Sequence, residues 1–178
     1  MRKPKMDGHG MQLRIKLAAI ASAMGLAVGL GVAFAGPAAA TNGIKVCVYK
    51  PAVGTIVCAL TVNQHLAPVT IGVYPGGSPF NAPTSGTGQI SLYQSSPATC
   101  MELHTNNLIV VDSCQGRASE RWSVIVGSVK IGSKTLQAYF YQSIYNPSLC
   151  LTSPPADGQL SAATCNFKNL NQEWFFQG

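Results

Sequence analysis

The sequence predicts an all-β fold built from three repeats of about 50 residues. Six cysteines recur as three pairs, each pair is followed by a similar tetrapeptide, and short alternating strands fill the space between them. The tetrapeptides are "NQHL" at 63–66, "SERW" at 119–122 and "NQEW" at 171–174. Since one repeat of about four short strands cannot hide its apolar face alone, the three are expected to close around a common core. A β-trefoil with one disulfide per repeat satisfies this requirement.

The first 40 residues have the pattern of a secretory signal peptide. Basic residues come first, an apolar run of 18 residues covers 17–34, and small residues stand at Ala38 and Ala40. Signal peptidase accepts only small side chains at these two places, so we expect cleavage after Ala40. The alternative is a single retained membrane anchor, because a run of this length is near the lower limit for crossing a bilayer.

Cleavage would leave residues 41–178 as a single domain. It removes five of the 12 Lys and Arg residues and one of the six acids, so the net charge falls from +6 to +2. So small a charge gives no reason to expect a nucleic-acid partner. No second long apolar run follows, so no membrane partner is expected after cleavage. The expected localisation is secreted and extracellular.

The six cysteines all follow the predicted cleavage site, and an even count in an exported chain indicates disulfides. The first members of the pairs recur at intervals of 53 and 50 residues, and the second members at 56 and 51. The simplest pairing closes each repeat on itself, as Cys47–Cys58, Cys100–Cys114 and Cys150–Cys165. The rival reading is a metal site, which is disfavoured because the chain has no CxxC and no closely spaced His pair.

Strands are expected where β-branched and aromatic residues alternate with polar ones. Such stretches lie at 44–50, 54–62, 69–74, 107–114, 121–127, 136–142 and 149–153. The segment 75–89 is rich in Pro, Gly and Ser and is expected to be a long surface loop after repeat one. The repeats would then span about 41–90, 91–142 and 143–178.

The recurring tetrapeptide is expected to supply the core. In an extended strand residues i and i+2 share a face, so Gln172 and Trp174 would point inward and Glu173 would face water. A buried tryptophan offers a large apolar area, and a glutamine can satisfy buried backbone groups of the neighbouring turn. The structural core positions predicted in this way are Gln64, Leu66, Glu120, Trp122, Gln172 and Trp174.

With its cysteine pairs, alternating strands and Gln-x-Trp motif, the chain resembles the ricin-type lectin β-trefoil family, whose repeats carry the Q-x-W signature. The match is close in repeat three, "LCLTSPPADGQLSAATCNFKNLNQEWFF", moderate in repeat two and faint in repeat one. The resemblance implies carbohydrate binding without catalysis. The repeats here are about ten residues longer than the family usually has, and the extra length lies in spacers such as 127–148.

The family's galactose sites place an Asp two residues after the first cysteine, an aromatic platform just ahead of the second, and an Asn beside the Q-x-W glutamine. The Asp place holds Tyr49, Glu102 and Thr152, the platform place holds Ile56, Asp112 and Ala163, and the Asn place holds Asn63, Ser119 and Asn171. No repeat keeps the complete set, so galactose binding by the family's usual route is not expected.

Several residues are candidates for carbohydrate contacts. Glu102 and Asp112 form a polar pocket in repeat two or remain two solvated carboxylates. In repeat three, Asp157 forms a ligand site or a tight turn with Gly158, and Asn166 and Asn171 contact a ligand or cap loops. Tyr139 and Tyr141 share one strand face, opposite Phe140, and form an exposed platform if Phe140 is the buried residue.

The function expected is a secreted, non-catalytic, carbohydrate-binding protein whose partner is a glycan or polysaccharide. The chain shows no GxSxG, HExxH or paired-carboxylate arrangement, and His65 and His104 stand far apart, so neither an enzyme nor a cofactor nor a metal is expected. The alternative is a β-trefoil that binds a protein, for example as a protease inhibitor, and its motives are the missing platforms and the loop 75–89.

Overall fold

The computed structural model describes residues 40–156 and 158–177. The predicted signal peptide therefore lies outside the described residues, except for Ala40, which begins the first strand. Asp157 also lies outside them. None of the helices in the described residues has the length and apolarity needed to cross a bilayer.

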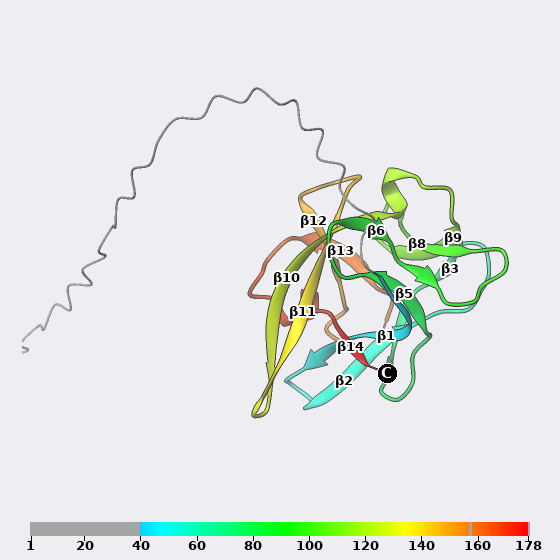
Figure 1. Cartoon of the computed structure of the whole chain (residues 1–178). Coiled ribbons are helices and arrows are strands. Elements are labelled where there is room, and N and C mark those ends of the chain that lie inside the picture. The colour runs from blue at the N-terminus through cyan, green and yellow to red at the C-terminus, as the bar shows by residue number, and fades with distance from the viewer. Residues whose placement is uncertain (1–39, 157, 178) are drawn as a thin grey trace, which may run out of the picture. The chain divides into compact units, whose positions relative to one another are not determined.

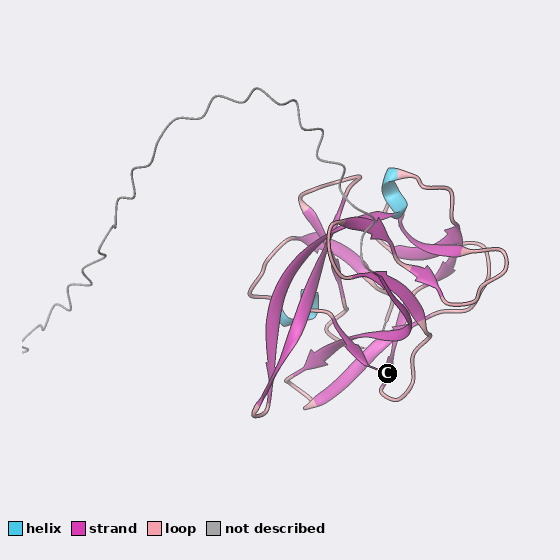
Figure 2. Ribbon diagram, viewed as in Figure 1, coloured by secondary structure: helices cyan, strands magenta, loops and turns pink. Residues whose placement is uncertain are grey.

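The described residues form two antiparallel sheets, with almost no helix (Figures 1 and 2). The nine-stranded sheet runs in the order β3 (Ala67–Pro68), β9 (Ile109–Ser113), β8 (Thr99–Leu103), β7 (Ser91–Leu92), β5 (Phe80–Pro83), β1 (Ala40–Lys50), β2 (Thr55–Leu60) and β4 (Thr70–Val73), and β14 (Phe175–Gln177) pairs with β1. The five-stranded sheet runs in the order β13 (Ser161–Thr164), β12 (Leu149–Thr152), β11 (Lys134–Ser143), β10 (Arg121–Ile131) and β6 (Thr87–Gln89). Isolated bridges join the two sheets at Thr70↔Gln159, Leu108↔Ser161 and Tyr139↔Trp174.

Each repeat closes on itself through its own disulfide, as the spacing predicts. The pairs are Cys47–Cys58, Cys100–Cys114 and Cys150–Cys165. No free cysteine remains. In repeats two and three the first cysteine lies on β8 or β12, and the second follows the next strand.

The two tryptophans lie in the core and occupy equivalent places in their repeats. Both are fully buried, and each indole donates to the carbonyl of the residue after the first cysteine. Trp122 Nε1 donates to Met101 O at 3.4 Å, and Trp174 Nε1 donates to Leu151 O at 2.9 Å. This repeated bond satisfies the indole N–H that a fully buried tryptophan would otherwise leave without a partner.

The polar partner of each tryptophan stands on a short 3-10 helix rather than on an extended strand. These helices are η1 (Ala118–Glu120) and η2 (Leu170–Gln172). Glu120 and Gln172 are both fully buried, as predicted. Each accepts from the backbone N–H that follows the second cysteine: Glu120 Oε2 from Gln115 and Gln172 Oε1 from Asn166, both at 2.8 Å.

Glu173 does not face water as the strand alternation predicts. The residue is buried, because the end of η2 breaks the two-residue period before β14 begins. Burial raises the pKa of its carboxyl group. The strand alternation therefore predicts the burial of Gln172 and Trp174 correctly. It fails for Glu173, because these three residues do not lie on one extended strand.

The prediction that Gln64 and Leu66 of repeat one are core residues is wrong. Both are exposed, Leu66 at 44%. The chain turns here instead of forming a 3-10 helix, since Ala67 N donates to Gln64 O at 3.1 Å and Leu66 has φ 54°. The neighbouring Ala67 and Val69 provide the buried side chains of this segment.

The segment 75–89 is not the long surface loop that its composition predicts. It contains β5 and β6, and Phe80 and Ala82 on β5 are fully buried. β5 pairs with β1 and β7, and β6 pairs with β10. Its Pro and Gly residues mark turns between short strands. An exposed loop at 75–89 therefore no longer supports the alternative protein-binding function.

The long spacer of repeat two forms the β10–β11 hairpin, whose pairing extends from Trp122↔Ser143 to Ile131↔Lys134. Its outer part packs on a second small core with the disulfide of repeat one and Phe175. Figure 1 shows this hairpin reaching past the strands beside it.

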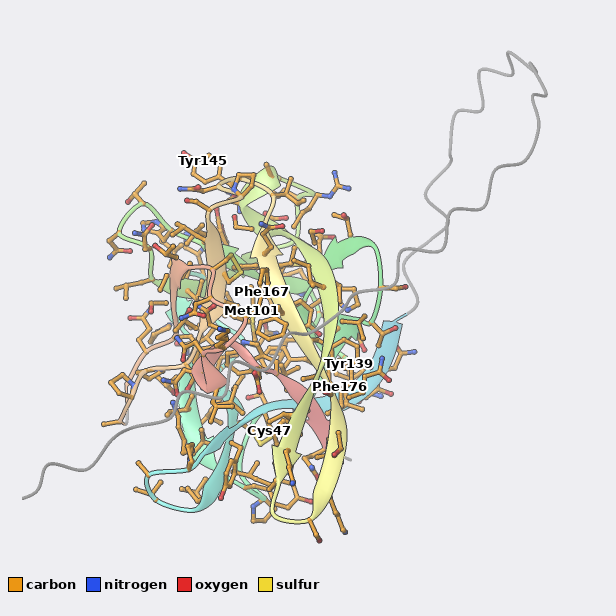
Figure 3. All side chains as sticks on the ribbon, turned by 90° about the vertical axis from the view of Figure 1, so that its left-hand side faces the viewer. Cys47, Met101, Tyr139, Tyr145, Phe167 and Phe176 are labelled. Carbon is orange, nitrogen blue, oxygen red and sulfur yellow. A yellow bond between two sulfur atoms is a disulfide. The ribbon has the colours of Figure 1, made fainter. Side chains whose placement is uncertain are left out.

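Tyr139 and Tyr141 do not form an exposed platform, because both faces of β11 are buried at residues 138–141. Tyr141 is fully buried and its hydroxyl donates to Pro83 O at 3.0 Å. Tyr139 stacks on Phe176 at 4.5 Å between ring centroids (Figure 3). Phe140, on the opposite face, is covered by Phe167 in an edge contact at 5.1 Å. The loop after the last cysteine thus covers the Phe140 face, while Tyr139 and Tyr141 on the other face belong to the main core.

Candidate functional site

Two of the three places that the sequence analysis assigns in repeat two, Glu102 and Ser119, meet in a surface pocket, which we call the repeat-two pocket. Its volume is about 240 Å³, and it is lined by Glu102, Leu103, His104, Thr105, Ser119 and Tyr145. Glu102 stands on β8, Ser119 on η1, and Tyr145 in the turn after β11. Three segments separated in sequence therefore contribute to one site.

The Glu102 carboxylate is buried and held in a fixed orientation. Ser119 Oγ donates to its Oε1 at 2.9 Å, and Arg117 Nη2 donates to its Oε2 at 3.0 Å. Each carboxylate oxygen can accept further hydrogen bonds. A ligand hydroxyl entering the pocket would therefore meet an acceptor that is already positioned.

Arg117 connects this carboxylate to two others. Its Nη2 also donates to Asp112 Oδ2 at 2.9 Å, and its Nε donates to Glu120 Oε1 at 2.6 Å. These contacts raise the pKa of the Arg117 guanidinium group. The expectation of two solvated carboxylates is wrong, since Glu102 and Asp112 are both buried beside one cation.

Asp112 does not line the repeat-two pocket, but it accepts a hydrogen bond from Arg117 and so holds the guanidinium group in place. Its Oδ1 accepts from the Ser113 N–H at 2.7 Å and lies 2.6 Å from His65 Nδ1. Burial alone would raise the pKa of Asp112, but the hydrogen bonds from Arg117, Ser113 and His65 outweigh it and lower the pKa to about 2. Asp112 is therefore an anion at neutral pH.

Glu120 is likewise held as a carboxylate. Burial opposes its ionisation, but the hydrogen bonds from Arg117 and from the backbone N–H groups of Gln115 and Gly116 lower its pKa. Gln89 Nε2 also donates to it at 2.8 Å. Glu120 is a structural member of the cluster and not a ligand contact, because its side chain is fully buried.

Tyr145 is the aromatic side chain of the repeat-two pocket, whereas the position before the second cysteine that the sequence analysis considered is not aromatic in any repeat. It is 66% exposed, and Figure 3 shows it at one end of the described domain. The turn that carries it is fixed on both sides, by Ile144 N donating to Arg121 O at 3.0 Å and by Asn146 N donating to Ser143 Oγ at 3.2 Å. The sequence signal was an aromatic residue directly before the Asn146-Pro147 turn.

The amides predicted in repeat three are used within the protein. Asn166 Oδ1 accepts from Lys168 N at 3.0 Å, and Asn166 N donates to Gln172, so Asn166 shapes its own loop. Asn171 Oδ1 accepts from Lys50 Nζ at 2.6 Å. Thr152, at the Asp place, accepts from Gln172 Nε2 at 3.0 Å. The structure therefore does not bring Asn166 into one ligand site with Asn171, and Asp157 lies outside the described residues.

Among the described residues, no group of three or more His, Cys, Asp and Glu side chains has an arrangement that could hold a metal ion. Although Glu102, Asp112, Glu120 and His65 lie close together, Arg117 occupies the space between the carboxylates. The cluster therefore has an internal cation.

No protein-family model matches this chain, and no characterised protein matches it in sequence. Among solved structures, it is similar to part of a mosquitocidal holotoxin, with a TM-score of 0.58 and 14% identity over 79% of this chain and 17% of that chain. It is also similar to part of Cry35Ab1, with a TM-score of 0.51 and 14% identity over 77% of this chain and 36% of that chain. This chain thus spans well under half the length of either protein, and at such identities the likeness shows a shared fold alone.

Proposed function

We propose that the protein is a secreted, non-catalytic carbohydrate-binding β-trefoil of the ricin-type lectin kind, and that the repeat-two pocket is its sugar site. The threefold arrangement is supported by one disulfide within each repeat, and repeats two and three also share equivalent tryptophan bonds and 3-10 helices. Secretion is supported by the three disulfides, which are typical of exported proteins. The similar toxins contain this fold as one portion of a longer chain, which is in keeping with a binding module.

The observation that carries the proposal is the meeting of an oriented carboxylate with an exposed aromatic ring in one pocket. The Tyr145 ring offers a flat apolar surface to the C–H face of a sugar. Glu102 accepts from one or two sugar hydroxyls, and His104 and Thr105, which also line the pocket, offer further polar groups. Tyr145 takes the role of the missing platform from a different segment of the chain.

A glycan array followed by calorimetric titration of the best neutral glycan tests this proposal. Tyr145→Ala is expected to weaken binding about three- to tenfold, the usual worth of one aromatic stacking contact. Tyr145→Phe keeps the ring and is expected to bind nearly as the wild type does. Tyr93→Ala is the matched control, because Tyr93 is a partly exposed tyrosine outside the pocket.

Two results would count against the proposed site. One is a glycan array without a single retained neutral glycan. The other is a neutral glycan whose affinity is the same for wild type and Tyr145→Ala, which would move the sugar site elsewhere on the protein.

A further inference from the structure

Lys50 is a buried cation that has no carboxylate partner among the described residues. The residue ends β1 and is only 6% exposed. Its Nζ donates to Asn171 Oδ1 and to Pro154 O, which are both neutral acceptors. The salt bridges of the described residues all involve His65 or Arg117. Buried charges are normally paired, so this lysine calls for an explanation.

The same lysine lines a surface pocket of about 340 Å³, which we call the Lys50 pocket. A second lysine, Lys168, stands on its wall, and no described residue that lines it is acidic. The third N–H of the Lys50 ammonium group has no protein partner in residues 40–156 and 158–177. Burial lowers the pKa of Lys50 to about 8, so the ammonium form still predominates at pH 7.

The rest of the lining is suited to a sugar ring. Val53 and Pro155 offer apolar surface, and Asn169 and Asn171 offer amide groups. The side-chain oxygens of both amides already accept hydrogen bonds, from Asn171 N and from Lys50 respectively. Their NH₂ groups are therefore the parts left to donate to ligand hydroxyls.

We propose that the Lys50 pocket binds the carboxylate of an acidic sugar, a hexuronate, between Lys50 and Lys168. The carboxylate supplies the counter-charge that Lys50 lacks, the apolar wall covers the ring's C–H face, and the two amides contact its hydroxyls. This site is separate from the repeat-two pocket, with which it shares no lining residue. It joins the end of β1 in repeat one to the η2 loop of repeat three.

The test is calorimetric titration of the mature chain with oligogalacturonate and oligoglucuronate, each beside its neutral methyl ester, at pH 6.5. The acids are expected to bind at least tenfold more tightly than the esters, because a hydrogen bond between charged groups is lost on esterification. Inorganic sulfate is titrated separately. If sulfate binds as tightly as the uronates, the pocket holds a bare anion and the sugar assignment is wrong.

Variants locate the site. Lys50→Met is expected to weaken uronate binding tenfold or more, and Lys168→Gln about two- to fivefold, because the Lys168 charge is exposed. Lys130→Gln is the matched control, since it removes an exposed lysine from the β10–β11 hairpin. Should Lys50→Met not fold, Lys168→Gln and the esters still decide the matter. Unchanged binding in Lys168→Gln, or equal binding of acids and esters, overturns the proposal.

The proposal would also be overturned if Lys50 had a carboxylate partner within the chain. Asp157 lies outside the described residues, two positions from Pro155 in the pocket wall. A double-mutant cycle of Lys50→Met and Asp157→Asn measures whether the two side chains are coupled. Additive effects on unfolding agree with an unpaired cation. Strong coupling shows that Lys50 already has its counter-charge within the chain. Tyr145→Ala is expected to leave uronate binding unchanged, so failure here and failure of the repeat-two site are distinguishable.

Discussion

Arg117 holds three carboxylates of repeat two in position through hydrogen bonds from its Nε and Nη2. Glu120 is the most dependent on it, because that side chain is fully buried and receives the Arg117 Nε–H at 2.6 Å. In repeat three a neutral side chain accepts the corresponding backbone hydrogen bond, since Gln172 occupies the place of Glu120. The two repeats thus offer a charged and a neutral version of one structural element.

This difference predicts the effect of Arg117→Met. The change leaves the Glu120 carboxylate buried without its cation, so the free energy of unfolding is expected to fall by roughly 3 kcal/mol. Adding Glu120→Gln reproduces the neutral arrangement of repeat three and is expected to restore a good part of this loss. Urea unfolding of both variants measures it. A double variant less stable than Arg117→Met would show that the two repeats are not interchangeable in this way.

Lys50 predicts a stability that rises in mild alkali. Burial lowers its pKa in the folded state to about 8 from an ordinary value of 10.5. Between these two pH values the unfolded chain holds a proton that the folded chain has released, so the free energy of unfolding increases with pH in this window. Below pH 8 both states are protonated and the contribution is constant. We therefore expect wild type to gain stability relative to Lys50→Met from pH 8 to pH 10. Thermal unfolding at each pH measures this difference. A difference in melting temperature between wild type and Lys50→Met that stays constant from pH 8 to pH 10 would contradict the lowered pKa of Lys50.

At the scale of elements, residues 138–141 of strand β11 are buried on both faces, and Phe167 of the loop 165–169 covers the Phe140 face. Phe167 covers Phe140, and Phe140 in turn lies over Gly127, where a Cβ atom would stand 2.9 Å from its ring. Any side chain larger than that of glycine at position 127 would displace the Phe140 ring. The loop, the strand and the glycine therefore form one packed unit.

Phe167→Ala tests this unit. Phe167 is itself 51% exposed. If its ring made no packing contact, its removal would leave the free energy of unfolding unchanged. Its edge contact with Phe140 predicts a decrease of about 1 kcal/mol in the free energy of unfolding, the usual worth of an aromatic pair. Tyr145→Ala serves as the control, because Tyr145 is also an exposed aromatic residue, at 66%, and its ring has no aromatic partner among the described residues. Equal stabilities of the two variants would contradict the assignment.

The elements also show what sequence reasoning could and could not reach. The disulfide pairing followed from a period of about 50 residues, and the burial of Trp122 and Trp174 from their place in a recurring motif. The burial of Phe140 depends on a loop 27 residues further along the chain, and alternation within one strand holds no information about it. Tyr145 and Lys50 were missed for the same reason, because their partners in each pocket come from other segments.

At the scale of the whole domain, β14 pairs with β1 and closes repeat three onto repeat one. The register runs from Cys47↔Phe175 to Lys45↔Gln177. Phe175 is buried beside the Cys47–Cys58 disulfide, and Phe176 stacks on Tyr139 of β11. The last strand therefore contacts both sheets.

This closure predicts that Phe175→Ala destabilises the entire domain and not only its last strand. The expected loss is about 3–5 kcal/mol, as for other large-to-small substitutions in a core. A single cooperative transition at lower denaturant concentration, seen equally by tryptophan fluorescence and circular dichroism, is the expected result. Gln177→Ala, two residues away and only partly buried, is the control. Two separate transitions would mean that the terminal strand melts by itself.

The antiparallel pairing of β1 with β14 also brings the two ends of the described domain together. Gln177 lies opposite Lys45. Ala40 lies five residues before Lys45 on the same strand, so about 17 Å of strand separates Ala40 from Lys45. A flexible bridge of roughly six residues would span it. A circular permutant with its old ends joined and new ends opened between Gly132 and Ser133, in the hairpin turn, would retain almost all the strand pairing. Its two new ends would then emerge at the tip of the β10–β11 hairpin, at residues that line neither pocket.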